Sequence, residues 1–206
     1  MIALIQARLN SKRFKKKALH LIKNKELILH VVEAVKKSKN ISEIIITTSN
    51  LRSDDKLVYL LKKYKIKIYR GSLNNVALRM LKAAQKFKIR HFIRISGDSP
   101  LIDYKIIDYA IETFKNHKNS DLVTNIFPRK YPSGQSVEII KTKTLEKNIK
   151  NFSLIEKEHV TKYFYSNYKK FKIANFKKNF NYYKNLPKLS IDYKSDLKKI
   201  MKYFKD

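Results

Sequence analysis

The chain has 206 residues and a mass of 24.5 kDa, a length that fits one domain, and 43% of its residues are hydrophobic, enough to fill a sizeable core. It has 47 Lys and Arg against 17 Asp and Glu, a net charge of +30, so its candidate partners are nucleic acid, anionic surfaces and phosphorylated substrates. With no Cys, disulfides, thiolate metal sites and cysteine nucleophiles are excluded. No stretch approaches the roughly 20 apolar residues of a membrane span, so we expect a cytoplasmic protein without membrane insertion.

Short apolar runs alternate with longer segments of helical period, the pattern of a parallel sheet flanked by helices. The predicted strands are residues 2–6, 43–48, 66–69, 92–96, 122–124 and 137–140. The predicted helices are residues 27–37, 53–64 and 74–87, and a fourth begins after Asp103, its expected N-cap. No linker or repeat divides the sequence. We therefore expect one α/β domain over residues 1–206, with a mostly parallel central sheet.

A basic loop, residues 6–17, directly follows the first predicted strand. In open α/β sheets, ligands bind beyond the carboxyl ends of the strands, so this loop is well placed for a site. Arg8, Arg13 and Lys17 supply cations, and Ser11 adds a hydroxyl donor, a combination that suits a polyphosphate. The loop lacks the glycines of a Walker A motif or a dinucleotide fingerprint. A solvated, lysine-rich loop is the alternative interpretation.

Glycine is rare, with three in the chain where average usage would give about 14. Gly71, Gly97 and Gly134 each lie at or just beyond the end of a predicted strand. They are therefore candidates for a positive φ angle or for close approach to a ligand. Ordinary turns are the alternative.

Two acidic residues follow apolar segments in a way that suits a metal site. Asp98 comes after a buried strand, and Asp192 follows the apolar residues 189–191. A carboxylate in such a place can hold Mg²⁺, which takes few protein ligands. Either aspartate could instead cap the turn or helix that follows, and Asp196 could be the N-cap in place of Asp192.

Six short motifs follow one another along nearly the whole chain. They are residues 6–19, Arg70-Gly71-Ser72, Gly97-Asp98-Ser99-Pro100-Leu101, Tyr131-Pro132-Ser133-Gly134 with Val137-Glu138, Glu158-His159-Val160-Thr161, and Ile191-Asp192. Together they resemble the spore-coat polysaccharide type of cytidylyltransferase, a family related to CMP-KDO synthetase and acylneuraminate cytidylyltransferase. The resemblance implies a nucleotide-diphospho-sugar-transferase-like (Rossmann-like) fold. It also implies a Mg²⁺-dependent enzyme that activates a sugar acid with CTP as co-substrate, giving a CMP-sugar and pyrophosphate for surface polysaccharide or glycan biosynthesis.

The resemblance assigns roles to residues at the matching positions. The implied catalytic residues are Arg8, Arg13, Lys17 and Asp98, of which the three cations would hold the triphosphate. The implied nucleotide contacts also include Ser11, Arg70, Gly71, Ser72 and Gly97. The implied metal ligands are Asp98 and Asp192. The implied sugar-side residues are Tyr131, Gly134, Gln135, Glu138 and His159. Related synthetases often dimerise, so the resemblance leaves a homodimer open, but nothing in the sequence identifies an interface.

This chain departs from the family pattern at several of these positions. The family usually has Gly at the position of Asn10 and Pro-Gly at residues 15–16, both of which are Lys here. Asn visits positive φ readily, so Asn10 suits such a turn, whereas Lys16 is expected to force a different turn. The family often has Asp where this chain has Ser133 and Ser136, so the identity of the sugar stays open.

Other functions remain open. Residues 162–188 interleave lysines with aromatics and contain no acid, so they could bind single-stranded nucleic acid or an anionic surface, although packing against the sheet is the favoured alternative. A non-catalytic or glycosyltransferase-like relative would share the same fold. Glu158 and His159 could form an acid/base pair, but a structural or sugar-side polar role is favoured for them. The remaining histidines lack ligand spacing, so we expect no zinc.

Overall fold

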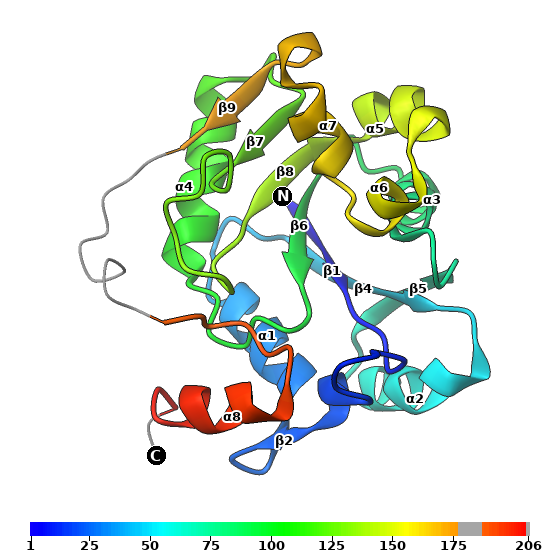
Figure 1. Ribbon diagram of the computed structural model, residues 1–206, viewed down its shortest axis with the longest axis vertical. Coiled ribbons are helices and arrows are strands. Elements are labelled where there is room, and N and C mark those ends of the chain that lie inside the picture. The colour runs from blue at the N-terminus through cyan, green and yellow to red at the C-terminus, as the bar shows by residue number, and fades with distance from the viewer. Residues whose placement is uncertain (177–186, 205–206) are drawn as a thin grey trace.

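A sheet of seven strands lies at the centre of the computed structural model, which describes residues 1–176 and 187–204 (Figure 1). The strands, in the order in which they lie across the sheet, are β5 (Lys67–Gly71), β4 (Glu43–Ser49), β1 (Ile2–Gln6), β6 (His91–Ser96), β8 (Glu138–Lys141), β7 (Leu122–Thr124) and β9 (Ile173–Asn175). Strand β8 is antiparallel to both neighbours, and the other neighbouring pairs are parallel. The predicted, mostly parallel α/β fold is confirmed. A separate short hairpin joins β2 (Leu21–Ile22) to β3 (Lys25–Glu26).

Helices connect the strands, and those predicted from periodicity form with small shifts at their ends. The α-helices are α1 (Leu27–Lys36), α2 (Asp55–Lys63), α3 (Val76–Lys86), α4 (Tyr104–Asn116), α5 (Thr142–Asn148), α6 (Leu154–Glu158), α7 (Lys162–Ser166) and α8 (Lys194–Met201). Asp103 is the N-cap of α4 as predicted, because its side chain accepts a hydrogen bond from the backbone N–H of Lys105 at 2.8 Å. Asn75 caps α3 in the same way, so that helix begins later than predicted. No helix in the described part of the chain has the length and apolar character to cross a membrane.

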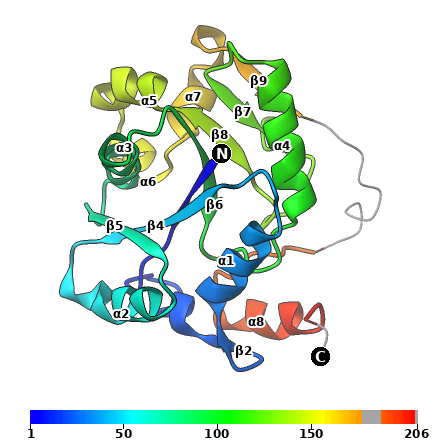
Figure 2. The same cartoon turned by 180° about the vertical axis from the view of Figure 1, so that it is seen from behind.

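The two faces of the sheet carry separate sets of helices. Successive side chains of a strand point to opposite faces. Ala3 and Ile5 of β1 therefore pack in the cluster formed with α1, α2, α4 and α8, whereas Leu4 packs on the other face with α3, α5 and α7. Figure 2 shows α1 and α4 lying over the first of these faces. Both faces are covered, as expected of strands that are apolar on both sides.

Aromatic residues of segment 162–188 contribute to this packing where the structure describes them. Phe164 is 1% exposed, and its ring lies 5.9 Å from that of Phe152 and 4.9 Å from that of Phe171. Tyr168 is half exposed. The aromatics of this segment that lie outside the described residues are Phe180, Tyr182 and Tyr183. The described part supports packing more than an exposed platform for stacking bases.

Strand β1 lies where the connection of the chain changes direction. From β1 the chain builds β4 and β5 on one side, and it then crosses to β6 on the other side. Such a change leaves a crevice beyond the carboxyl ends of the two diverging strands. Gln6 and Ser96, the last residues of β1 and β6, are register partners at these ends. This edge of the sheet is therefore the expected place for a ligand.

Candidate active site

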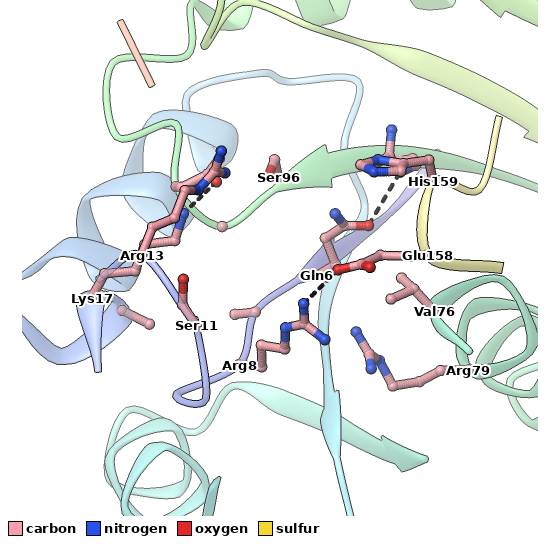
Figure 3. A pocket seen from close by; sticks show the side chains of 15 residues that line it. Gln6, Arg8, Ser11, Arg13, Lys17, Val76, Arg79, Ser96, Glu158 and His159 are labelled. Atoms are coloured by element: carbon pink, nitrogen blue, oxygen red, sulfur yellow. Dashed lines mark hydrogen bonds and ion pairs between the residues drawn. The ribbon is translucent and has the colours of Figure 1, made fainter. Parts of the chain in front are cut away.

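A cavity of about 280 Å³ lies at the carboxyl ends of β1 and β6, and we call it the β1–β6 pocket (Figure 3). The predicted site residues that line it are Arg8, Ser11, Arg13, Lys17, Gly97, Asp98 and His159. The other lining residues are Gln6, Ala7, Ala18, Val76, Arg79, Arg94, Ser96 and Glu158. The loop after β1, the Gly-Asp pair after β6 and the end of α6 thus meet at one cavity.

Gly97 is required where the two strand ends meet. Its backbone N–H donates to the carbonyl oxygen of Gln6 at 2.8 Å. A Cβ atom at this position would lie 2.7 Å from that oxygen and 3.0 Å from the Cβ of Ala7, too close for any side chain. Gly97 is therefore required for close backbone packing against β1 and has no positive φ, while its approach to a ligand stays a prediction.

A buried carboxylate holds the loop that follows β1. Asp54, just before α2, accepts a hydrogen bond from the backbone N–H of Leu9 at 2.7 Å. Its other oxygen accepts from the Thr48 hydroxyl at 2.8 Å and the Ser49 N–H at 3.0 Å. Asp54 is fully buried, so water cannot replace these donors. The start of the basic loop is thereby tied to the end of β4, which sets the direction of the residues that follow.

The left-handed residue of the loop is Lys16. Asn10, which would tolerate a positive φ, does not adopt one. Lys16 does, at φ 57° and ψ 19°, a conformation that favours glycine. The conformation is imposed by its hydrogen bonds, because the Lys16 N–H donates to the Leu9 carbonyl at 2.8 Å and its own carbonyl accepts from Leu19 at 2.9 Å.

Lys17 lies between the two predicted metal ligands. Its Nζ is 2.6 Å from Oδ2 of Asp98 and 3.7 Å from Oδ1 of Asp192. It also donates to the carbonyl oxygen of Ile191 at 2.8 Å. The side chains of both aspartates are mostly buried, at 20% and 19% exposed. Two carboxylates and a carbonyl therefore converge on the position of one cationic group.

Neither Asp192 nor Asp196 is the N-cap of α8, because Tyr193 occupies that position. Asp196 lies in the first turn of the helix, and its Oδ2 accepts hydrogen bonds from the backbone N–H groups of Asp192 at 2.8 Å and Tyr193 at 2.9 Å. The Asp192 carboxylate is left to face the basic side chains. Burial acts to raise the pKa of Asp192, but the hydrogen bond from Lys188 and the charges of the neighbouring lysines and arginine outweigh it and lower the pKa. Asp192 therefore stays ionised at neutral pH, as a ligand for a cation must.

Arg13 and Arg8, the other two cations predicted to hold the triphosphate, are also held by carboxylates from distant elements. The Arg13 Nη2 lies 2.5 Å from Oδ1 of Asp192. The Arg8 Nη2 lies 2.6 Å from Oε1 of Glu158, at the end of α6, as Figure 3 shows. Because Glu158 binds Arg8, a positioning role is favoured for it over an acid/base pair with the neighbouring His159, which faces the same pocket.

Glu138, predicted to face the sugar, is buried beneath the pocket. It is the register partner of Arg94 across β6 and β8, and the two side chains form an ion pair. The Tyr165 hydroxyl donates to the same carboxylate and lies 2.8 Å from the hydroxyl of Thr124. Burial, together with the charge and hydrogen bond of Glu138, raises the pKa of Tyr165 well above its ordinary value. Arg94 lines the pocket and donates to Gln6 Oε1 at 3.2 Å, so Glu138 acts there through Arg94.

The remaining predicted sugar-side residues hold the segment before β8 in place. Gly134 has φ +99°, and a Cβ there would lie 2.5 Å from the Leu189 carbonyl carbon, so its predicted positive φ is confirmed. Gln135 is buried and bonds to the backbone of the loop before α4 at 2.9 and 2.6 Å. The ring of Tyr131 packs 6.2 Å from that of Phe176. None of these three predicted residues is among those lining the β1–β6 pocket, so their contact with the sugar stays a prediction.

The turn formed by Arg70, Gly71 and Ser72 is likewise not among the lining residues. Arg70 turns away toward the loop before α2, where it donates to the Ser49 carbonyl at 3.0 Å and pairs with Asp55 at 2.7 Å. Contact of this turn with the base and ribose therefore stays a prediction.

Arg79 lines the pocket, but sequence analysis did not identify it. It lies on the face of α3 that packs into the core, between the buried residues Val76 and Ala83. The signal that could have found it is a charged residue on an apolar helical stripe, because buried arginines are rare without a function or a partner.

Comparison with known proteins agrees with this geometry. A family model described as cytidylyltransferase matches residues 2–205. A solved cytidylyltransferase from Leptospira borgpetersenii is 31% identical, with a TM-score of 0.90 over 100% of this chain and 88% of that chain. The spore coat polysaccharide biosynthesis protein SpsF of Bacillus subtilis is 28% identical over 79% of this chain and 69% of its own length. The 3-deoxy-manno-octulosonate cytidylyltransferase of Thermodesulfovibrio yellowstonii is 31% identical over 58% of this chain, but the match covers 49% of that enzyme.

The family model covers almost the whole chain, and the solved relative shares the full fold. The motif residues of the loop after β1 and of the strand end at β6 meet in one pocket. This chain belongs to the cytidylyltransferase family.

Proposed function

We propose that this protein activates a sugar acid with CTP in a Mg²⁺-dependent reaction that yields a CMP-sugar and pyrophosphate. The observation that carries the proposal is the convergence of Arg8, Arg13, Lys17 and Asp98 at the β1–β6 pocket. Asp192 is not among the lining residues, but it pairs with both Arg13 and Lys17. Membership of the cytidylyltransferase family supports CTP as the co-substrate. Similarity to a 3-deoxy-manno-octulosonate cytidylyltransferase supports a sugar acid as the acceptor, and similarity to SpsF supports a role in surface polysaccharide synthesis.

The chemistry needs positioning and charge neutralisation. A sugar hydroxyl oxygen attacks the α-phosphorus of CTP, the bond from that phosphorus to the bridging oxygen breaks, pyrophosphate leaves and the hydroxyl proton is released. Negative charge grows on the leaving pyrophosphate. Arg8, Arg13 and Lys17 are placed to stabilise it, because their side chains face the same cavity from one loop. Each now pairs with a carboxylate, so phosphate oxygens can replace those partners without leaving the cations unpaired.

The residues present fit a magnesium ion. Carboxylate and carbonyl oxygens are the donors that Mg²⁺ prefers, and such an ion needs few of them from the protein. The Lys17 ammonium, held by Asp98, Asp192 and the Ile191 carbonyl, marks a place where a cation is favoured. Asp98 and Asp192 would hold the metal there, and it would supply positive charge to the phosphate oxygens.

Thermal unfolding in the presence of nucleotides tests the proposal. A ligand that binds the native state raises the melting temperature, so CTP with Mg²⁺ should stabilise the protein more than UTP, ATP or GTP does. Release of pyrophosphate from CTP should then depend on addition of a sugar acid. Equal stabilisation by all four nucleotides, disappearing with added salt, would contradict CTP selectivity and favour indiscriminate binding of phosphate by the basic surface.

The Asp98→Asn variant tests the metal site. We expect turnover to fall by at least about 100-fold, while the melting temperature changes little because the side chain keeps its volume. Glu112→Gln, an exposed change on α4, removes the same charge away from the pocket and should leave turnover unchanged. Turnover of Asp98→Asn at the level of Glu112→Gln would remove Asp98 from the site.

A further inference from the structure

Arg79 is a buried arginine at the β1–β6 pocket. It is 2% exposed and comes from the first part of α3, close to Arg8, which comes from the loop after β1. Figure 3 shows the two guanidinium groups facing each other at one side of the cavity, away from Lys17. The six sequence motifs do not include Arg79.

Arg79 has hydrogen bonds to the backbone but no counter-ion among the described residues. Its Nη1 donates to the carbonyl oxygen of Ser72 at 2.6 Å and lies 3.5 Å from that of Leu73. Its Nε is buried without a hydrogen-bond partner. Buried arginines normally pair with a carboxylate, because an unpaired buried charge is costly. Arg79 therefore retains unused capacity to bind an oxygen ligand.

The groups around Arg79 add to the free-energy cost of keeping its guanidinium charged in the folded protein. Arg8 donates to the same Leu73 carbonyl at 3.2 Å, so two positive groups are anchored side by side. Burial first, and then the charge of Arg8, lower the pKa of Arg79 to about 10, although Asp54 acts in the opposite direction. A cation in the first turns of a helix also opposes the helix dipole. Burial, the charge of Arg8 and the helix dipole each raise the free energy of the folded protein when Arg79 is charged. An arginine retained at such a cost to stability is expected to have a role in binding.

The turn at residues 70–72 supports the Arg79 side chain. A Cβ atom at Gly71 would lie 3.1 Å from the Cγ of Arg79, so glycine leaves room for the arginine stem. Ser72 accepts the Nη1 hydrogen bond and also binds the Asn75 N–H through its hydroxyl at 3.0 Å. The turn thus places Arg79, whether or not it contacts a nucleotide itself.

We infer that Arg79 and Arg8 together form a two-guanidinium site for an oxyanion of the substrates, with Arg79 as a binding residue of the reaction. The inference rests on the proposed function for the identity of those substrates. Paired guanidinium groups suit the oxygens of a phosphoryl group or of a carboxylate. Arg8 already binds a carboxylate oxygen of Glu158 at 2.6 Å, so the site accepts this chemistry. The oxyanion comes either from the phosphates of the nucleotide or from the carboxylate of a sugar acid.

The test compares Arg79→Gln and Arg79→Lys with Lys82→Gln, a matched control that removes an exposed charge from the same helix. Calorimetry would give the affinity of each variant for pyrophosphate, CTP and CMP. We expect Arg79→Gln to bind pyrophosphate and CTP about tenfold more weakly or worse, as is typical for loss of charged hydrogen bonds. The affinity of Arg79→Lys for these ligands should lie between those of the wild type and Arg79→Gln, because lysine keeps the charge but not the forked geometry. Lys82→Gln should resemble the wild type.

The same variants separate the two sources of the oxyanion. If pyrophosphate affinity falls, the site takes a phosphoryl group. If the affinities for nucleotide and pyrophosphate are unchanged but the KM for 3-deoxy-manno-octulosonate rises about tenfold at saturating CTP, the site binds the carboxylate of the sugar acid. Unchanged pyrophosphate and CTP affinities together with an unchanged KM in both Arg79 variants would overturn the inference.

Stability distinguishes a binding role from a structural one. Removal of an unpaired buried charge should leave the melting temperature of Arg79→Gln at or above that of the wild type without ligand. A lower melting temperature in both Arg79 variants, with unaltered ligand affinity, would instead identify Arg79 as an anchor for the turn and overturn the inference. If pyrophosphate binding depends on Arg79 but CTP is not preferred over other nucleotides, the oxyanion site stands and the proposed function fails.

Discussion

Lys16 is a residue whose backbone conformation costs stability. At φ 57° it occupies the left-handed region, where the Cβ of a non-glycine residue crowds the following carbonyl. Replacement by glycine removes this crowding but makes the unfolded chain more flexible. We expect Lys16→Gly to raise the free energy of unfolding by about 0.5–1 kcal/mol, measured by urea denaturation.

Lys15→Gly is the matched control for this prediction. Lys15 is exposed like its neighbour but has a negative φ, so glycine there adds flexibility to the unfolded chain and relieves no strain. It should lower stability slightly. An equal loss of stability in both variants would show that the left-handed turn is not strained by lysine.

The loop after β1 depends as an element on the buried Asp54. Four donors converge on this carboxylate: the Leu9 N–H, the Thr48 hydroxyl, and the N–H and hydroxyl of Ser49. Removal of the side chain would leave them unsatisfied in a buried site. We expect Asp54→Ala to lower the free energy of unfolding by about 2–4 kcal/mol, measured by urea denaturation. Asp55→Ala, which breaks an exposed ion pair with Arg70, should cost less than about 1 kcal/mol. Similar losses in the two variants would contradict the buried role of Asp54.

The start of α8 should depend on pH through Asp196. Burial acts to raise the pKa of Asp196, but hydrogen bonds from two backbone N–H groups and from Lys188 outweigh it and lower the pKa to about 2. A carboxyl whose pKa is lower in the folded state stabilises it above its unfolded pKa, about 3.9, and that stability is lost as pH falls through the folded value. We therefore expect the wild type to lose stability between about pH 4 and pH 2 more steeply than Asp196→Asn does. Parallel curves of unfolding free energy against pH would contradict this.

At the scale of the whole molecule, the net charge of +30 predicts weak binding to any polyanion. Affinity for a single-stranded oligonucleotide should fall by roughly 1000-fold or more between about 50 and 200 mM salt, because each phosphate contact releases a counterion. CTP held in the β1–β6 pocket should lose less than about tenfold over the same range, since short-range contacts in a cavity are screened less. Fluorescence anisotropy at several salt concentrations measures both. An oligonucleotide affinity that still exceeds the affinity for CTP at about 200 mM salt would revive the nucleic-acid alternative.

The sequence was most informative about local structure. Short apolar runs placed β1, β4 and β6, and the expected cap at Asp103 placed the start of α4, because these features depend on residues only a few positions apart. The loop at residues 6–17 was harder. The positive φ lies at Lys16 and not at Asn10, because hydrogen bonds to Leu9 and Leu19, formed only when the loop closes, decide the turn.

The order of short motifs along the sequence was by itself enough to determine the fold class and the cytidylyltransferase family. Only the tertiary structure decided which charges meet. Lys17 reaches Asp98 and Ile191, which are 81 and 174 positions away, and Arg70 turns toward Asp55 and away from the pocket. Partners so far apart in the chain are selected by the positions of strand ends after folding, which no local propensity encodes. The burial of Arg79 beside Arg8 was decided in the same way, when α3 packed against the sheet.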